Sequence, residues 1–482
     1  MRPVLAVLAC LLAAAPAAHA GLPKGFVGLY GDDAFFGDPG YRSSQLAMQS
    51  HVGVETVRQP LEWWRVERAP GNFDFSDYDG YVADAATAGL NVLPVLMGPP
   101  EFRSSRPPDS RSRAMFPPKD NADFAAFAEA AVRRYGASGS FWRSHTDVPY
   151  LPIHSWQVWN EPNIPNFWRS GPDARRYVAL LEAGAAAIRA ADPSAEVVAG
   201  GLPNSNLGVP FLQYLERMYE AGAKGSFDTL AVHAYSRDVA GLLSLVESAR
   251  TLMDRYGDRS PLWITEFGWS TGGDASAFRV SERGQANRIA GALSALVAER
   301  RMLRLRGFIL FKWKDSLAPP ETAGDPWPLH TGLLDSRGGP KRGFWAFARV
   351  VDGLRRHAAS WPPGSAKLAR VSRRTVRLSP RGYAAVGVGC GSGEAGACAG
   401  TLRLRTVRPL SCGGVSRAAG SQLGTARFRV IVAPSIVPVR LTGAARALTQ
   451  CAGRIRVRAT VAEPRSAQTS GARAVEFVIR AR

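Results

Sequence analysis

The sequence has 482 residues, with 60 Lys plus Arg against 40 Asp plus Glu and a formal net charge of +20. At 46% hydrophobic and 21% charged residues its composition is that of a globular protein, which excludes a disordered or collagen-like chain and leaves room for two or three domains. The charge is unevenly distributed, because residues 366–482 carry 21 basic and 3 acidic side chains whereas the first 365 residues carry 39 and 37. The basic character therefore belongs to the C-terminal quarter.

Residues 1–20 have the features of a secretory signal peptide. Arg2 is their only charge, Val4–Ala15 is apolar, and Ala18-His19-Ala20 is an A-x-A cleavage site. A membrane anchor is the alternative, but the apolar run is short for a span, and no later segment reaches the roughly 18 uninterrupted apolar residues that a transmembrane helix needs. We expect a secreted, extracellular protein with no membrane span.

From residue 25 onwards, short apolar segments alternate with longer amphipathic ones, which is typical of a parallel sheet with crossover helices. We expect eight strands: Phe26–Tyr30, Thr56–Leu61, Asn91–Met97, Ser155–Trp159, Glu196–Gly200, Thr229–Ala234, Leu262–Phe267 and Gly307–Trp313. Between the last two, Ile289, Leu293, Leu296 and Val297 have the spacing of one helix face. The prediction is an α/β fold, a (β/α)8 TIM barrel over residues 21–359. An open doubly wound sheet is the alternative, but no glycine-rich turn follows the first strand.

Residues 360–365 have the composition of a linker, and beyond them the hydrophobic period changes to two. In Arg454-Ile455-Arg456-Val457-Arg458, for example, apolar residues alternate with arginine, which predicts a small all-β, sandwich-like domain over residues 366–482 with its arginines facing solvent. Once Cys10 leaves with the signal, all remaining cysteines lie in this domain, so we expect one or two disulfides there, of open connectivity. These cysteines are Cys390, Cys398, Cys412 and Cys451. Their spacing does not fit a zinc site.

Two glutamates each follow an apolar strand. Glu161 comes after Trp156-Gln157-Val158-Trp159-Asn160, and Glu266 after Leu262-Trp263-Ile264-Thr265. In a barrel the carboxyl ends of the strands meet at one mouth, where active sites form. A desolvated carboxylic acid beside an ionised carboxylate is the pair that glycoside hydrolysis uses. The alternative for each residue is a structural ion pair at a strand end.

The residues around both glutamates resemble a known signature. Trp159-Asn160-Glu161-Pro162-Asn163 and Trp263-Ile264-Thr265-Glu266-Phe267-Gly268-Trp269 resemble the acid/base and nucleophile segments of retaining glycoside hydrolases of the large (β/α)8 superfamily (clan A), especially family 39, family 5 and the Asl1-like group. The resemblance implies that Glu161, ending the fourth strand, is the acid/base, and that Glu266, ending the seventh, is the nucleophile.

Further matches extend the resemblance from about Gly25 to Phe347. It implies that Arg58 keeps the nucleophile ionised, that Asn160 binds the sugar 2-hydroxyl, and that His233 and Tyr235 face the mouth, with Tyr235 hydrogen-bonded to the nucleophile. Phe311 and Trp313 share a strand face, and Trp313 is the expected aromatic platform under the sugar. Each of these residues also has a structural alternative. Arg58 could be a surface arginine and Asn160 a capping residue, while His233 could have a structural role and Trp313 could simply pack in the core.

The main hypothesis is therefore a secreted retaining glycosidase that hydrolyses O-glycosidic bonds, expected to be β-linked, of an oligosaccharide or polysaccharide by double displacement and needs no cofactor or metal. The competing hypothesis is a non-catalytic carbohydrate-binding or cell-wall protein with a barrel groove and a polyanion-binding β module. No G-x-S-x-G elbow or P-loop supports another chemistry, and one G-x-G-x-x-G match, at Gly391–Gly396, lacks a following helix. The Pro-rich loops at residues 99–118 and 315–330 are expected to shape the groove, whereas the sugar, its linkage and exo or endo action stay open.

The C-terminal domain resembles small β modules appended to secreted actinobacterial proteins. Its arginines would fit a polyanion such as an anionic cell-wall polymer, with nucleic acid less suited to an exported module. The alternative is that these arginines have no ligand. They would then reflect the composition of the whole chain, which has 53 Arg against 7 Lys, or serve to discourage aggregation through charged strands.

Overall fold

The computed structural model describes residues 22–112, 115–317, 324–355, 369–371, 375–378, 382–390, 398–430, 435–462 and 474–481. The expected signal segment, the expected linker and the Gly391–Gly396 match lie outside these residues. None of the helices in this part of the chain has the length and apolar character needed to cross a membrane.

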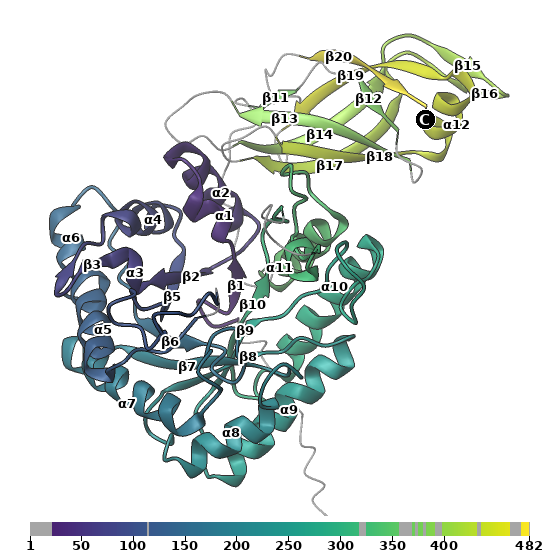
Figure 1. Ribbon diagram of the computed structural model, residues 1–482. Coiled ribbons are helices and arrows are strands. Elements are labelled where there is room, and N and C mark those ends of the chain that lie inside the picture. The colour runs from purple at the N-terminus through teal and green to yellow at the C-terminus, as the bar shows by residue number, and fades with distance from the viewer. Residues whose placement is uncertain are drawn as a thin grey trace, which may run out of the picture.

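Eight parallel strands close into a barrel in the order β1-β10-β9-β8-β7-β6-β5-β2, as predicted (Figure 1). Their bounds are β1 Val27–Tyr30, β2 Thr56–Glu62, β5 Asn91–Met97, β6 Ser155–Asn160, β7 Glu196–Pro203, β8 Thr229–His233, β9 Leu262–Glu266 and β10 Leu305–Phe311. Leu93, Val198, Ala231, Trp263 and Ile309 form a buried cluster contributed by five of these strands. The barrel interior is therefore packed, and only its mouth can hold a ligand.

Helices surround the barrel and bury one apolar face each against it. They are α1 Asp32–Phe36, α2 Pro39–His51, α3 Trp63–Val66, α4 Ser76–Thr87, α5 Asn121–Tyr135, α6 Ser140–Ser144, α7 Ala174–Ala191, α8 Phe211–Glu220, α9 Val239–Arg255, α10 Glu282–Glu299 and α11 Arg342–Arg355, with the 3-10 turn η1 Trp327–His330 and the hairpin β3 Glu67–Ala69 and β4 Asn72–Phe73. The predicted helix face is confirmed in α10, where Ile289, Leu293 and Leu296 are buried.

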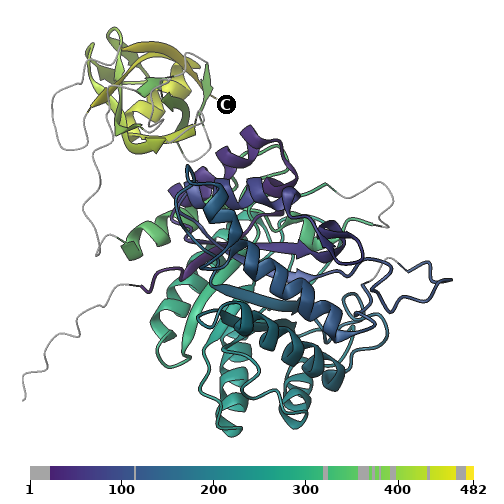
Figure 2. The ribbon, with the colours of Figure 1, turned by 90° about the vertical axis from the view of Figure 1, so that its left-hand side faces the viewer.

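Several crossover helices begin at a side chain that accepts hydrogen bonds from the first free backbone N–H groups. The capping residues are Asp38, Asp120, Asp173, Asp238 and Ser281, before α2, α5, α7, α9 and α10. These caps define where each mouth loop ends. The mouth faces the viewer in Figure 1 and lies at the right of Figure 2, where the long loop between β5 and α5 projects.

The C-terminal region has its own hydrophobic core, which shares no residue with that of the barrel. One eight-stranded sheet runs in the order β11-β13-β18-β17-β14-β19-β20-β12, and it curls about helix α12 (Figure 2). The elements are β11 Ala369–Val371, β12 Val376–Arg377, β13 Tyr383–Cys390, β14 Cys398–Thr406, β15 Leu410–Cys412, β16 Val415–Arg417, β17 Gln422–Val430, β18 Ser435–Leu441, α12 Gly443–Ala452, β19 Arg454–Ala462 and β20 Val475–Arg480.

The expectation of a mainly β domain is confirmed, but its core is enclosed by one curled sheet rather than by two facing sheets. The bridge between Leu378, just after β12, and Ala384 in β13 brings the two sides of the sheet together. The alternation of apolar and polar residues in the sequence specifies which side chains face inward. It does not specify which strands pair, so it could not distinguish one curled sheet from two facing sheets.

A disulfide joins Cys412 to Cys451, 39 residues apart. It links the β15–β16 hairpin to α12, and the side chains of Cys390 and Cys398 lie outside the described residues. Closing a loop of this length removes entropy from the unfolded chain and is worth about 3 to 4 kcal/mol in the chain-entropy account.

We predict that Cys412→Ser with Cys451→Ser lowers the free energy of unfolding of the C-terminal sheet by about 3 kcal/mol. Amide hydrogen exchange in β14 and β19 measures the change, with β6 and β9 of the barrel as internal reference and Ser411→Ala as the control variant. Unchanged protection in β14 and β19 would show that the crosslink does not stabilise this sheet.

Candidate active site

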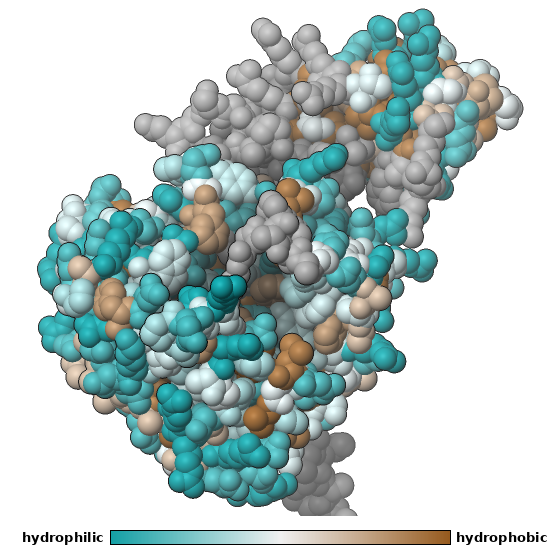
Figure 3. All heavy atoms as spheres, in the orientation of Figure 1, coloured by the Kyte–Doolittle hydropathy of each residue, from teal (hydrophilic) through white to brown (hydrophobic). Residues whose placement is uncertain are grey.

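The chemically important residues lie on four strands at the barrel mouth. Arg58 is in β2, Asn160 ends β6 and Glu161 follows it, His233 ends β8 and Tyr235 lies two residues later, and Glu266 ends β9. The structure thus places Glu161 after the fourth barrel strand and Glu266 at the end of the seventh, as expected. The face seen in Figure 3 is hollowed near its centre, in front of these strand ends.

A buried arginine connects three of the strands. Arg58 is 2% exposed and donates from Nη1 to Glu266 Oε1 at 2.6 Å and from Nη2 to Asn160 Oδ1 at 2.7 Å. Its Nε donates to Gln157 Oε1 at 3.0 Å. A buried guanidinium requires this full set of acceptors, and it forms an ion pair with the Glu266 carboxylate.

Gln157 is a site residue that the sequence analysis did not identify. It is wholly buried in β6, accepts from Arg58, and donates to the Trp159 carbonyl oxygen at 2.9 Å. An amide side chain inside an otherwise apolar strand is the signal that would have indicated it.

Tyr235 donates its hydroxyl hydrogen bond to Glu266 Oε2 at 2.8 Å. Burial, followed by the negative charge of Glu266, raises the pKa of Tyr235 well above its usual value, so the phenol stays protonated and remains a donor. Both oxygens of Glu266 are therefore held by donors, one from Arg58 and one from Tyr235.

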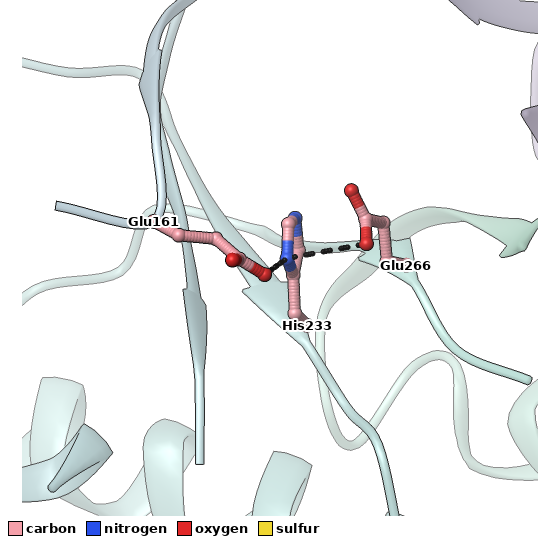
Figure 4. Close-up of side chains that lie close together, drawn as sticks. All are labelled: Glu161, His233 and Glu266. Carbon is pink, nitrogen blue, oxygen red and sulfur yellow. Dashed lines mark hydrogen bonds and ion pairs between the residues drawn. The ribbon is translucent and has the colours of Figure 1, made fainter. Parts of the chain in front are cut away.

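Glu161 has a different environment. Its side chain is 12% exposed, and its Oε1 lies 2.6 Å from His233 Nδ1 (Figure 4). Burial raises the pKa of Glu161 to about 8, with the positive charge of Arg58 acting in the opposite direction. At neutral pH this carboxyl group carries a proton.

His233 lies between the two glutamates, with Nδ1 3.5 Å from Glu266 Oε2 as well (Figure 4). Burial lowers the pKa of His233 to about 3, so the ring is neutral. Its Nε2 is buried with no hydrogen-bond partner. We therefore assign the ring proton to Nδ1, which donates to Glu161 Oε1 and leaves Glu161 Oε2 to carry the acid proton.

Local backbone geometry presents Glu161 to the mouth. Trp159 and Glu161 have φ angles of 69° and 44°, in the left-handed region that side chains disfavour. The buried Trp159 ring holds this conformation by packing edge-on against Phe124 and Trp168 and by donating from Nε1 to the Phe167 carbonyl. Such conformations persist only where packing enforces them.

The expected platform residue does not lie at this site. Trp313 is 0% exposed, donates to Gln45 Oε1 at 2.9 Å and packs near Phe344, so the assignment of Trp313 to sugar binding is wrong. The strand ends at Phe311, and alternation along a strand no longer applies beyond it. Phe311 itself is partly exposed, stacks on Tyr30 at 4.9 Å and meets the Tyr235 ring edge-on at 6.2 Å.

Loop aromatics enclose the side of the mouth next to Tyr235. Trp327, in the loop after β10, lies 5.2 Å from the Tyr235 ring and 4.6 Å from the ring of Phe278 in the loop after β9. The loop after β5 is tied to the loop after β6 by the bond from Met115 N to the Asn166 carbonyl. The described parts of both long loops thus border the groove.

A second aromatic group lies at the rim of the mouth. Phe36, at the end of α1, is 64% exposed, and Trp64, in α3, is 46% exposed. The Arg65 guanidinium lies 4.4 Å from the Trp64 ring centre and 5.4 Å from that of Phe36. Because α1 and α3 directly follow β1 and β2, this aromatic rim pair, Phe36 and Trp64, borders the same opening as the glutamates.

Glu161, His233 and Glu266 each present one possible metal-ligand atom, and the three atoms lie within 4.8 Å of one another. The guanidinium of Arg58 already supplies the positive charge beside Glu266. A metal ion on this carboxylate would be repelled by that charge, so the donor set fits proton transfer and nucleophilic attack better than metal binding.

Residues 153–296 match the family described as glycosyl hydrolase catalytic core, a segment that contains both glutamates. No curated protein matches the sequence.

Solved structures with this fold include a family 39 glycoside hydrolase from Bacteroides cellulosilyticus WH2, with 15% identity, a TM-score of 0.50, and coverage of 88% of this chain and 82% of that one. A glucosidase from Croceicoccus marinus has 17% identity and a TM-score of 0.51, with 86% and 83% coverage. A monomeric β-xylosidase from Caulobacter crescentus CB15 has 15% identity and a TM-score of 0.51, with 88% and 98% coverage. At these identities the structures establish a shared fold. With a closed (β/α)8 barrel and a match of residues 153–296 to the glycosyl hydrolase catalytic core, this protein is a glycosidase that resembles the (β/α)8 glycoside hydrolases in fold.

Proposed function

We propose that the protein is a retaining glycosidase that cleaves β-linked oligosaccharides or polysaccharides, with Glu161 as acid/base and Glu266 as nucleophile. The observation that carries the proposal is the closeness of the two carboxyl groups, because one oxygen of Glu161 lies within 4.8 Å of one oxygen of Glu266. Retaining enzymes hold these groups about 5 to 5.5 Å apart, whereas inverting enzymes need about 6.5 to 9.5 Å to admit a water. The β-xylosidase among the proteins of this fold supports β-linked substrates.

In the first step Glu266 attacks the anomeric carbon while Glu161 gives its proton to the departing glycosidic oxygen. The bond from carbon to that oxygen breaks, a glycosyl ester with Glu266 forms, and Glu161 becomes a carboxylate. In the second step Glu161 takes a proton from water, the water oxygen bonds to the anomeric carbon, and Glu266 leaves. Each residue returns to its starting state.

The remaining side chains position these two. Arg58 and Tyr235 hold both Glu266 oxygens, so the carboxylate is oriented before substrate arrives. Because Asn160 Oδ1 accepts from Arg58, its Nδ2 amino group is directed elsewhere and is the donor for the sugar 2-hydroxyl. Phe311, in place of Trp313, supplies the aromatic surface under the sugar.

We also propose that the protein acts outside the cell. The support is the signal-like segment at residues 1–20 and the Cys412–Cys451 disulfide, a crosslink that persists in oxidising compartments.

Replacing either glutamate should separate the two roles. We expect Glu266→Gln to lower kcat on aryl β-glycosides by about 10⁴-fold or more, because no nucleophile remains. Glu161→Gln should lower kcat/KM by about 10²- to 10⁴-fold for glycosides with a poor leaving group, and much less for dinitrophenyl glycosides, whose leaving group needs no proton. Steady-state kinetics on both leaving groups measure this, with Glu129→Gln on the exposed side of α5 as control. Full activity in either active-site variant would refute the assignment.

The pH profile should report the protonation of Glu161. Its raised pKa means that the acid is protonated below about pH 8 and is lost as the pH rises through that value. We expect kcat/KM for a substrate with a poor leaving group to fall above about pH 8, and the Glu161→Gln variant to lack this fall. The measurement is kcat/KM from pH 5 to 10 in both proteins. An identical basic limb in the variant would assign the titration to another group.

The aromatic rim pair should bind sugar units remote from the cleaved bond. We expect Phe36→Ala and Trp64→Ala each to lower kcat/KM on long oligosaccharides by about three- to tenfold, the range of one aromatic contact, and to leave aryl monosaccharide glycosides within about twofold. Tyr150→Ala is the matched control, since Tyr150 is 64% exposed and precedes the amino end of β6. Equal losses on short and long substrates would argue against a remote subsite.

A further inference from the structure

The C-terminal sheet has two chemically different faces. Inward positions of β14, β19 and β20 hold apolar residues of the buried core, among them Leu404, Val457 and Ile479. The outward positions between them carry arginine. We call the following set the arginine face: Arg377, Arg403, Arg405, Arg454, Arg456, Arg458 and Arg480.

These arginines come from four neighbouring strands, because β14, β19, β20 and β12 are consecutive in the sheet. All of them except Arg403 are exposed. Figure 3 shows hydrophilic side chains gathered over this part of the sheet. The face is therefore continuous across the strands rather than a set of isolated charges.

Strand register brings like charges directly opposite one another. Arg405 pairs with Arg458 across β14 and β19, and Arg454 pairs with Arg480 across β19 and β20. Arg480 also pairs with Arg377 of β12. Like charges at such positions lie about 5 Å apart at their Cβ atoms and destabilise the sheet.

Little negative charge offsets this repulsion. Residues 366–482 contain only three acidic side chains, Glu394, Glu463 and Glu476. Of these, Glu476 lies on the arginine face and accepts from Arg458 at 2.7 Å, while the other two lie outside the described residues. Among the described residues, one carboxylate thus faces seven guanidinium groups.

We propose that the arginine face binds an anionic glycan, a polymer of sugars or polyols bearing carboxylate or phosphate groups. Arginines at alternate positions recur about every 6.7 Å along a strand, and neighbouring strands are about 4.8 Å apart, so the face presents a regular array of charges. Guanidinium groups bind carboxylate and phosphate oxygens with paired hydrogen bonds. A bound polyanion would neutralise the positive charges of arginines that lie opposite other arginines on neighbouring strands.

A glycan fits this face better than nucleic acid. Proteins that bind single strands stack the bases on aromatic rings, and the outward positions of these four strands in the described residues hold arginine, threonine, valine and glutamate without an aromatic ring. The other domain of the chain is a glycosidase, so a glycan bound by the sheet would hold the barrel near saccharide and raise its effective concentration.

The test uses the full-length protein and a triple variant, Arg405→Gln, Arg454→Gln and Arg456→Gln. A control removes the same charge from exposed positions on the barrel helices α7 and α8, through Arg175→Gln, Arg176→Gln and Arg217→Gln. Binding to immobilised polygalacturonate and to poly(glycerol phosphate) is measured at about 50 and 300 mM salt, with dextran as the uncharged polymer and duplex DNA as the competing anion.

We expect the wild type and the control to bind at least one anionic glycan and to release it at high salt, and the triple variant to bind about tenfold or more weakly. The two polymers distinguish carboxylate from phosphate recognition. Turnover of a small aryl glycoside should be unchanged in all three proteins, and thermal unfolding should show the triple variant to be at least as stable, because Arg405 and Arg454 face like charges. No binding to either glycan, an equal loss in the control, or tighter binding to DNA would overturn the proposal.

Discussion

The buried Arg58 guanidinium is the interaction on which the active site depends. A charge at the centre of a packed barrel is tolerated only if acceptors surround it, and here they come from β6 and β9 as Gln157, Asn160 and Glu266. Because these bonds join strands that are far apart in sequence, they fix the relative positions of Glu266, the proposed nucleophile, and of Asn160, which precedes the proposed acid/base. Removing Arg58 would leave a buried carboxylate without its counter-charge, which costs more than the pair itself contributes.

The two glutamates differ chemically because their surroundings differ. Glu266 has a cation and a phenol as donors, whereas Glu161 faces a neutral histidine, and its burial raises its pKa to about 8. His233 can occupy its position because Gly201 has no side chain, since a Cβ there would lie 2.0 Å from Nε2. In the mechanism that we propose, these different environments make Glu161 the acid and Glu266 the nucleophile.

Most of the barrel could be predicted because its strands are buried on both faces and appear as continuous apolar runs, and the two glutamates because each interrupts such a run at its end. The Trp313 prediction failed because it extended a period-two pattern beyond Phe311, where β10 ends and the Trp313 side chain turns toward Gln45. Gln157 was missed because buried hydrogen bonding depends on partners about a hundred residues away. Likewise, the alternation in Arg454–Arg458 predicted an arginine-bearing face, whereas the opposition of Arg454 and Arg480 required the register.

The distribution of charge separates two kinds of recognition. Residues 1–365 are nearly neutral, with 39 basic and 37 acidic side chains. At the mouth of the barrel, the positive charge of Arg58 is neutralised by its ion pair with Glu266. Such a site exerts little long-range attraction on an anion, so selection there depends on hydrogen bonds and aromatic contact. The excess of positive charge lies instead in the C-terminal region, where residues 366–482 carry 21 basic and 3 acidic side chains. Solvent-exposed guanidinium groups there avoid the desolvation cost that Arg58 must meet with three acceptors. Arginine thus holds the proposed nucleophile where it is buried and paired with a carboxylate. Where it is exposed and lies opposite other arginines, it is available to the anionic glycan that we propose.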